Sequence, residues 1–162
     1  MRALLVCVVL FLAPSAFAAD WSHYVNVRYG FATDVPPGFA GQGEAANSDG
    51  QVFATPTAEL RVFGANIFAS DFEAEVRERE ASDAADGWGL TYKVSTPAAA
   101  SWSGRQGGRI LYVRAIALCA GTQIGVIRFT YMRSDLAAFD PVVERLVRAF
   151  RATDESAMCG AT

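Results

Sequence analysis

Few side chains in this sequence are of the types that perform catalysis. The chain has one histidine, His23, and a Ser-His-Asp or Cys-His arrangement would have to use it. His23 lies only a few residues after a predicted signal peptide, where we expect no rigid active site. We therefore predict no catalytic residue, and whether the protein is an enzyme stays open.

An aromatic and a basic side chain beside a glycine-rich turn are the best candidates for binding. Trp102 stands between two serines, and Arg105 follows Gly104 on the way to Gly107-Gly108. Tryptophan and arginine are favoured anchors of binding sites, so Trp102 and Arg105 are the candidates to line a groove. The alternative is that the aromatic side chain belongs to the core. The glycines lack the Lys-Ser/Thr pair of a phosphate loop.

Two stretches carry oxygen ligands close together. Asn47-Ser48-Asp49-Gly50 has only Glu44 nearby, whereas a calcium loop needs several more carboxylates, so we predict a tight turn. Residues 71–86 hold seven acids against Arg77 and Arg79. They are spread around a predicted helix, which favours a solvated face over a site for cations or a basic partner. We predict no metal site and no cofactor.

The first 18 residues are typical of a secretory signal peptide. Arg2 precedes the apolar run from Ala3 to Ala13, and Ala16-Phe17-Ala18 is a small-x-small cleavage site. We expect the mature chain to begin at Ala19 and to be periplasmic or secreted. An uncleaved anchor is the alternative, although the run is shorter than the roughly 20 residues that span a bilayer.

Two cysteines remain in the predicted mature chain, Cys119 and Cys159. An even number of cysteines in an exported protein favours a disulfide, which would here close a loop of about 40 residues. Two free thiols are an alternative, and a redox pair would more often be Cys-x-x-Cys. We expect a structural Cys119–Cys159 disulfide.

Composition limits the class of protein. Hydrophobic residues make up 52% of the chain, which excludes a disordered protein, and the net charge of −3 argues against nucleic-acid binding. No apolar run after residue 18 reaches membrane length, so we expect no membrane-spanning segment in residues 19–162. These residues are predicted to form a single α+β domain.

Hydrophobic periodicity predicts mostly strands, with two main helices. A capping box at Ser70-Asp71-Phe72-Glu73 begins the first helix, and Asp140-Pro141 begins the last. The helix stripe is Val143, Leu146, Val147 and Phe150. The predicted elements are strands at 24–28, 31–35, 51–55, 59–64, 88–95, 98–103, 109–119 and 123–132, a helix at 71–85, a helix from 140, and a loop at 41–50.

The strands at 109–119 and 123–132 are the strongest, and we predict that they form a hairpin with Cys119 opposite Gln123. This register gives one wholly apolar face, on which the last helix should pack, and places Arg114 opposite Arg128. Two arginines in that position are unfavourable unless acids lie near them. We expect acids of the first helix to lie over them.

The order of these elements, together with Tyr29-Gly30-Phe31-Ala32-Thr33-Asp34-Val35-Pro36, resembles the Mog1/PsbP-like fold. Members of that group often open with YGF-x-x-x-x-P and begin their closing helix near an aromatic-Asp-Pro, here Phe139-Asp140-Pro141. Tyr24 to Phe31 also resembles the start of small uncharacterised secreted bacterial proteins, although Asn47-Ser48-Asp49-Gly50 has Ser where those carry Gly. The resemblance implies an α+β sandwich, with an antiparallel sheet and two main helices packed against it.

The group includes photosystem accessory proteins and a small-GTPase partner, so the resemblance implies binding or assembly more than catalysis. No functional residue of the group matches this chain, and none is transferred. We expect a non-enzymatic module that binds an envelope protein or a small molecule. The alternatives are a carrier of a small ligand, and an enzyme that uses carboxylates and arginine.

Overall fold

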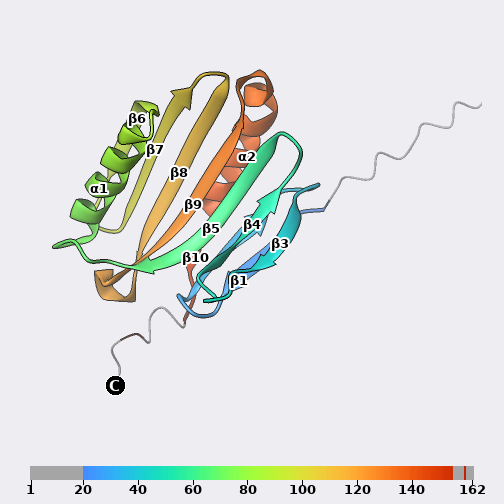
Figure 1. Ribbon diagram of the computed structural model, residues 1–162. Helices are drawn as coiled ribbons and strands as arrows, with labels where there is room; N and C mark the ends of the chain where they lie inside the picture. Colours follow the sequence, from blue (N-terminus) through green and yellow to red (C-terminus); the bar gives the residue numbers. More distant parts are fainter. Residues whose placement is uncertain (1–19, 155–158, 160–162) are drawn as a thin grey trace, which may run out of the picture.

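The computed structural model describes residues 20–154 and residue 159, so the predicted signal peptide, residues 1–18, lies outside it. Strands predominate, and two helices complete the fold (Figure 1). Along the chain the elements are β1 (Ser22–Asn26), β2 (Phe31–Val35), β3 (Ala40–Glu44), β4 (Gly50–Ala54), β5 (Ala58–Asn66), α1 (Phe72–Ala85), β6 (Gly89–Ser95), β7 (Ala99–Gln106), β8 (Arg109–Leu118), β9 (Gln123–Met132), α2 (Leu136–Ala149) and β10 (Arg151–Ala152). No helix in this described part is long and apolar enough to cross a membrane.

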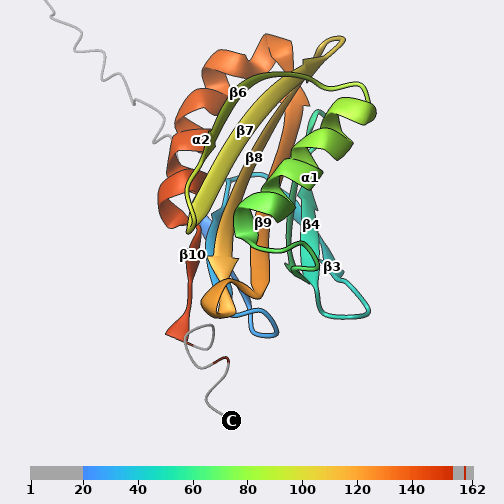
Figure 2. The same cartoon turned by 90° about the vertical axis from the view of Figure 1, so that its left-hand side faces the viewer.

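A large antiparallel sheet is the centre of the molecule. Its seven strands lie in the order β3-β4-β5-β9-β8-β7-β6, and a second sheet has the order β1-β2-β10. The two helices lie on opposite sides of the large sheet (Figure 2). This confirms the predicted α+β architecture of an antiparallel sheet with two main helices packed against it.

One core lies between the large sheet and the layer formed by α2 and the small sheet. Leu146 and Phe150 of the predicted helix stripe are buried in it, and the ring of Phe31 from β2 meets that of Phe150 at 5.6 Å. Leu60 and Phe129 of the large sheet are fully buried here. Each large apolar side chain buried in this way stabilises the fold by about 1.5–3 kcal/mol.

The second core lies under α1, and its apolar part is small. Phe72 and Val76 are the buried apolar side chains of α1, and they pack against the far face of the sheet. The other buried positions of the helix are acids: Glu75, Glu80 and Asp83. The expectation of a solvated acidic helix is therefore wrong for these three side chains, since each is buried and has a cationic partner.

The helix boundaries differ from the predicted ones at both N-termini. Asp71, not Ser70, caps α1: its Oδ1 accepts the Ala74 N–H at 2.7 Å, while the Ser70 hydroxyl donates to Asp71. The helix α2 begins at Leu136, one turn before the predicted Asp140, and contains Pro141. The earlier start lets Phe139 pack on Phe129, with ring centroids 5.1 Å apart.

The register of the β8–β9 hairpin is one residue away from the predicted one. Leu118, not Cys119, lies opposite Gln123. The loop has four residues because Cys119 and Ala120 adopt positive φ values of 52°, and the Cys119 carbonyl accepts hydrogen bonds from the N–H and hydroxyl of Thr122. A shift of one residue exchanges the faces of a whole strand.

The corrected register separates the two arginines that were predicted to face each other. Arg114 pairs with Ile127 and Arg128 with Val113, so the arginines lie on opposite faces of the sheet. On its other side, Arg128 lies opposite Arg61 of β5. Asp83 of α1 pairs with Arg128, as expected of an acid of the first helix.

Candidate functional site

The structure separates the two residues predicted to bind together. Trp102 is 1% exposed and lies under α1, whereas Arg105, three residues later on β7, is exposed on the opposite face. Successive residues of a strand point to alternate faces, so an odd spacing of three separates the two side chains. Trp102 and Arg105 therefore do not line one groove.

Trp102 has a structural position between the sheet and α1. Its indole N–H donates to Asp83 Oδ2 at 2.7 Å, and Asp83 Oδ1 accepts from Arg128. Lys93 of β6 pairs with Glu80 at 2.8 Å. These polar contacts attach α1 to the β6, β7 and β9 strands, and the apolar stripe of the helix is correspondingly thin.

The other half of the same sheet face is not covered by a helix. Figure 1 shows α1 at the β6–β7 end of the sheet, away from β4 and β3. The Arg79 guanidinium of α1 reaches β5, where it lies 5.9 Å from the centroid of the Phe63 ring. A hollow of about 640 Å³ lies over this uncovered half, at the β3–β4 hairpin. We call it the hairpin groove; its lining is Gln42, Gly43, Glu44, Ala45, Asn47, Asp49, Gly50, Gln51, Val52, Arg61, Val62 and Phe63.

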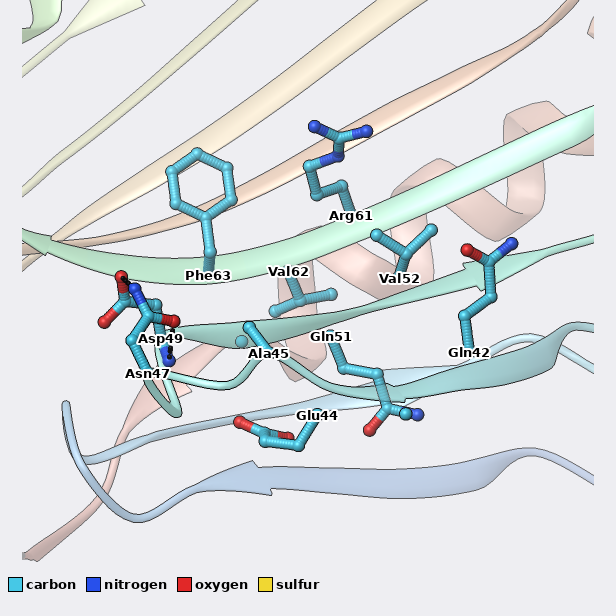
Figure 3. Close-up of a pocket in the computed structure, with 12 residues that line it drawn as sticks. Gln42, Glu44, Ala45, Asn47, Asp49, Gln51, Val52, Arg61, Val62 and Phe63 are labelled. Atoms are coloured by element: carbon cyan, nitrogen blue, oxygen red, sulfur yellow. Dashed lines mark hydrogen bonds between the residues drawn. The ribbon is translucent and has the colours of Figure 1, made fainter.

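An arginine, an aromatic ring and an aliphatic side chain rise from the floor of the hairpin groove. Figure 3 shows Arg61 and Phe63 of β5 and Val52 of β4 pointing to the same side of the sheet. Arg61 keeps 52% of its side chain exposed, and within residues 20–154 its ion-pair partner is Glu59, at 3.1 Å. Such an exposed ion pair contributes little to stability, so the guanidinium can exchange Glu59 for another anion at low cost.

The hairpin loop that borders the groove is held by the Tyr24 to Phe31 motif. Asn26 Nδ2 donates to the Ser48 carbonyl at 2.9 Å and to Glu44 at 3.1 Å. Arg28 pairs with Asp49 at 2.7 Å. The Tyr24 to Phe31 stretch therefore positions the Asn47-Ser48-Asp49-Gly50 turn.

Tyr24 belongs to the same network and joins the two sheets. Its hydroxyl donates to both Glu44 carboxylate oxygens at 2.9 Å. Burial raises the pKa of Tyr24 to about 12, and Glu44 acts in the same direction against the opposing hydrogen bond from Asn26. The hydroxyl therefore stays protonated at neutral pH. Within the described residues, no group of three or more histidine, cysteine or acidic side chains is placed to hold a metal.

A second hollow lies on the α2 side of the sheet, at the opposite end. It measures about 360 Å³ and lies between α2 and the β7–β8 strands. We call it the helix cleft; its lining is Thr91, Ser103, Gly104, Arg105, Ile110, Tyr112, Tyr131, Leu136, Asp140, Val143 and Glu144. Arg105, one of the two predicted binding residues, thus lines the helix cleft, whereas Trp102 lines a separate hollow of about 250 Å³ beside α1, together with Asp83 and Arg128.

Two tyrosine hydroxyls belong to the lining of the helix cleft. Burial raises the pKa of Tyr112, and burial together with the negative charge of Asp140 raises the pKa of Tyr131. Both phenols therefore carry their protons at neutral pH and can donate hydrogen bonds. Their hydroxyls add neutral donors to a cleft that already contains charged groups.

The helix cleft contains acids that the sequence did not indicate. Asp140 and Glu144 lie one helical turn apart on α2 and line the cleft with Arg105. The one available signal was the i,i+4 spacing of the two acids. An assignment to a site also required knowing that α2 runs beside β7.

His23 and the two cysteines lie away from both hollows. His23 Nδ1 lies 3.3 Å from Asp34, which also accepts from Arg145 at 2.9 Å. Burial would raise the pKa of Asp34, but the hydrogen bonds from Arg145 and His23 outweigh it and lower the pKa. Cys159 is in hydrogen-bond contact with Cys119, and this contact raises the pKa of the Cys159 thiol.

Comparison with known proteins gives structural matches alone. No protein-family model matches the chain, and no curated protein sequence matches it. The solution structure of cyanobacterial PsbP (CyanoP) from Synechocystis sp. PCC 6803 matches with a TM-score of 0.61 and 12% identity, over 86% of this chain and 96% of that chain. The crystal structure of the Saccharomyces cerevisiae Ran-binding protein Mog1p matches with a TM-score of 0.60 and 13% identity, over 83% and 96%.

Identities of 12% and 13% carry information on architecture and none on activity. Both matches extend over nearly the whole of the known proteins. They agree with the predicted α+β architecture. The chain therefore has the Mog1/PsbP-like fold.

Proposed function

We propose that this protein is an exported, non-enzymatic module that binds a partner protein of the cell envelope through the hairpin groove. The observation that carries this proposal is the uncovered half of the large sheet, where Val52, Arg61 and Phe63 rise together from the floor. An exposed arginine beside an aromatic ring is a favoured anchor for a protein partner. The fold neighbours PsbP and Ran-binding Mog1p support a role in binding or assembly.

The shape of the groove favours a protein partner over a small molecule. The hollow of about 640 Å³ lies open over the sheet face, and its floor and border come from β3, β4, β5 and the hairpin loop. Small molecules are usually held in clefts that bury most of their surface. An extended segment with an acidic side chain next to an apolar one would match Arg61 and Phe63.

Export and the disulfide belong to the same proposal. The apolar run from Ala3 to Ala13 and the Ala16-Phe17-Ala18 site support cleavage before Ala19. The contact between Cys119 and Cys159 supports a disulfide in an oxidising compartment. Periplasmic and extracellular locations are both consistent with these features.

Native mass spectrometry of the protein purified gently from its own envelope fraction tests the proposal. We expect a mass above that of the Ala19–Thr162 polypeptide, and the excess should disappear on denaturation. Arg61→Glu should abolish the excess mass, because it reverses the charge on the groove floor. Arg133→Glu makes the same charge change at an exposed residue outside the groove and should retain it.

Three results would contradict the proposal. A monomer without excess mass would argue against a stable partner. Equal loss of the excess mass in Arg61→Glu and in Arg133→Glu would show that the hairpin groove is not the binding surface. Recovery of a chain that still begins at Met1 would exclude the predicted cleavage.

A further inference from the structure

The helix cleft has walls of opposite charge. Arg105 of β7 is on one side, and Asp140 and Glu144 of α2 are on the other. Within residues 20–154 and 159, no hydrogen bond or ion pair involves the side chain of Arg105 or of Asp140. In the same described part of the chain, the ion-pair partner of Glu144 is Arg148, at 3.7 Å, with both side chains about 70% exposed.

These charges face a shared cleft without neutralising each other. An ion pair across the cleft would bring nitrogen and oxygen within 4 Å, and no such pair forms there among the described residues. A cation and an anion held apart in this way are complementary to a molecule that carries both charges. Each end of such a molecule would gain a charge-assisted hydrogen bond, which is stronger than a neutral one.

The remaining lining adds an apolar floor and neutral donors. Ile110 is 7% exposed and Leu136 is 37% exposed, so the cleft has both a buried and an accessible apolar side chain. Tyr112 and Tyr131, both protonated at neutral pH, belong to the same lining. A pocket with a mostly apolar surface and a few convergent polar groups is typical of small-molecule sites.

The volume limits the size of the ligand. About 360 Å³ is near the lower end of the range of small-molecule sites, which runs from about 300 to 1,000 Å³. The cleft is too small for a folded domain and is lined by different residues from the hairpin groove. Its ligand is therefore independent of the partner proposed above.

We infer that the helix cleft binds a small zwitterion, an apolar amino acid or dipeptide. Its carboxylate lies on Arg105, its ammonium group lies on Asp140 and Glu144, and its apolar side chain packs on Ile110 and Leu136. This site would make the protein a carrier or sensor of such a compound. No bond is made or broken in this binding step.

Isothermal titration of the purified Ala19–Thr162 protein with three matched probes tests the assignment of charges. The probes are L-phenylalanine, its amide, which lacks the carboxylate, and N-acetyl-L-phenylalanine, which lacks the ammonium group. L-phenylalanine should bind about 10- to 100-fold more tightly than either derivative, because each loses one charge-assisted contact. The dipeptide alanyl-phenylalanine shows whether a longer separation of charges fits better.

Two variants test the position of the site. Arg105→Gln and Asp140→Asn should each weaken L-phenylalanine binding by about 10-fold or more. Arg133→Gln and Glu78→Gln make the same changes at exposed residues outside the cleft and should leave binding unchanged. Thermal melting of all four variants verifies folding, which should survive because Arg105 and Asp140 are exposed.

Several outcomes would overturn the inference. Equal affinity for L-phenylalanine and N-acetyl-L-phenylalanine would mean a simple anion site. No heat of binding for L-phenylalanine or the dipeptide at millimolar concentration would exclude the proposed ligand class. Binding that is unchanged in Arg105→Gln would place the ligand elsewhere. None of these outcomes bears on Arg61, so this inference and the proposed function can fail separately.

Discussion

Replacing Asp83 by asparagine should weaken the attachment of α1 to the sheet, because the carboxylate holds donors from two different strands. It accepts from Trp102 Nε1 on β7 at 2.7 Å and from Arg128 on β9. The side chain of Asp83 is 5% exposed and that of Arg128 is 28% exposed. Asparagine keeps an oxygen for the indole N–H, but the guanidinium loses its charged partner.

The size of the expected loss in unfolding free energy depends on how exposed Arg128 is. Removing one partner of a fully buried ion pair costs about 3–5 kcal/mol, and a hydrogen bond to a charged group contributes about 1.5–3 kcal/mol. Since water reaches part of Arg128, the lower range applies, and Asp83→Asn should lower the free energy of unfolding by about 2 kcal/mol. Asp83→Ala also leaves the buried Trp102 N–H without an acceptor, at a further cost of about 1–3 kcal/mol.

Equilibrium urea unfolding, followed by circular dichroism, measures these losses, provided that the slope of the transition is unchanged. Glu144→Gln is the matched control, because its partner Arg148 is 3.7 Å away and both side chains are about 70% exposed. It should cost less than about 0.5 kcal/mol.

A double-mutant cycle isolates the interaction between the two partners. Combining Asp83→Asn with Arg128→Gln should give a coupling energy of about 1 kcal/mol or more. The reasoning would be refuted by an Asp83→Asn loss as small as that of Glu144→Gln, together with a coupling energy near zero. The helix would then be held by Phe72, Val76 and the Glu80–Lys93 ion pair without a measurable contribution from Asp83.

Three further predictions concern other parts of the fold. The pKa of Tyr24 rises from 10.0 to about 12 in the folded protein, so its contribution to stability is complete below pH 10.0 and is lost as the pH rises through 12. Tyr24→Phe should reduce this loss of stability, which the urea midpoint measured between pH 10 and 12 reports. A midpoint that falls as steeply with pH as in the unchanged protein would contradict the prediction. The denatured, unreduced protein should be two hydrogens lighter than its dithiol form, and Cys159→Ser should lower the urea midpoint; a full dithiol mass would exclude the Cys119–Cys159 bond. Gly64→Ala would place its Cβ 2.2 Å from Tyr29 Cγ and should cost about 1–3 kcal/mol in urea unfolding, whereas a wild-type midpoint would argue against that close contact.

Most of the helices and strands could be predicted because they depend on residues that lie close together in the sequence. The strand at 31–35 and the strand at 123–132 have the predicted bounds, since runs of apolar and β-branched residues of this length indicate a strand. The strand β3 was predicted as loop. Its residues Ala40-Gly41-Gln42-Gly43-Glu44 are all exposed and have low strand propensity, so only pairing with β4 makes them a strand.

The register of the β8–β9 hairpin depends on a backbone conformation that the residue types of its loop do not indicate. Positive φ angles favour glycine, but here Cys119 and Ala120 adopt them before Gly121. The predicted face of β9 is nevertheless the one on which α2 packs, because Ile127 and Phe129 belong to that core. After its first residue, β8 has one face that is wholly apolar and another that, apart from Arg114, is mostly apolar, so the sequence did not distinguish the two registers.

The candidate sites were less predictable than the fold because they combine distant segments. Arg105 could be chosen from its type and its turn, but its neighbours Asp140 and Glu144 come from a helix that follows two further strands. Trp102, by contrast, is buried under α1. A buried indole N–H needs a hydrogen-bond acceptor, and Asp83 of α1 supplies it.

The small sheet imposes an order on the folding of the chain. Its middle strand, β2, is flanked by β1 and by β10, which comes about 120 residues later along the chain. On the core side of β2, the ring of Phe31 packs against that of Phe150, at the end of α2. Closing so long a loop is entropically slow, and the pairing cannot begin until the last strand is available. During vectorial synthesis, the first strands of the small sheet therefore stay without their β10 partner, and accessible to other molecules, until α2 and β10 have been made.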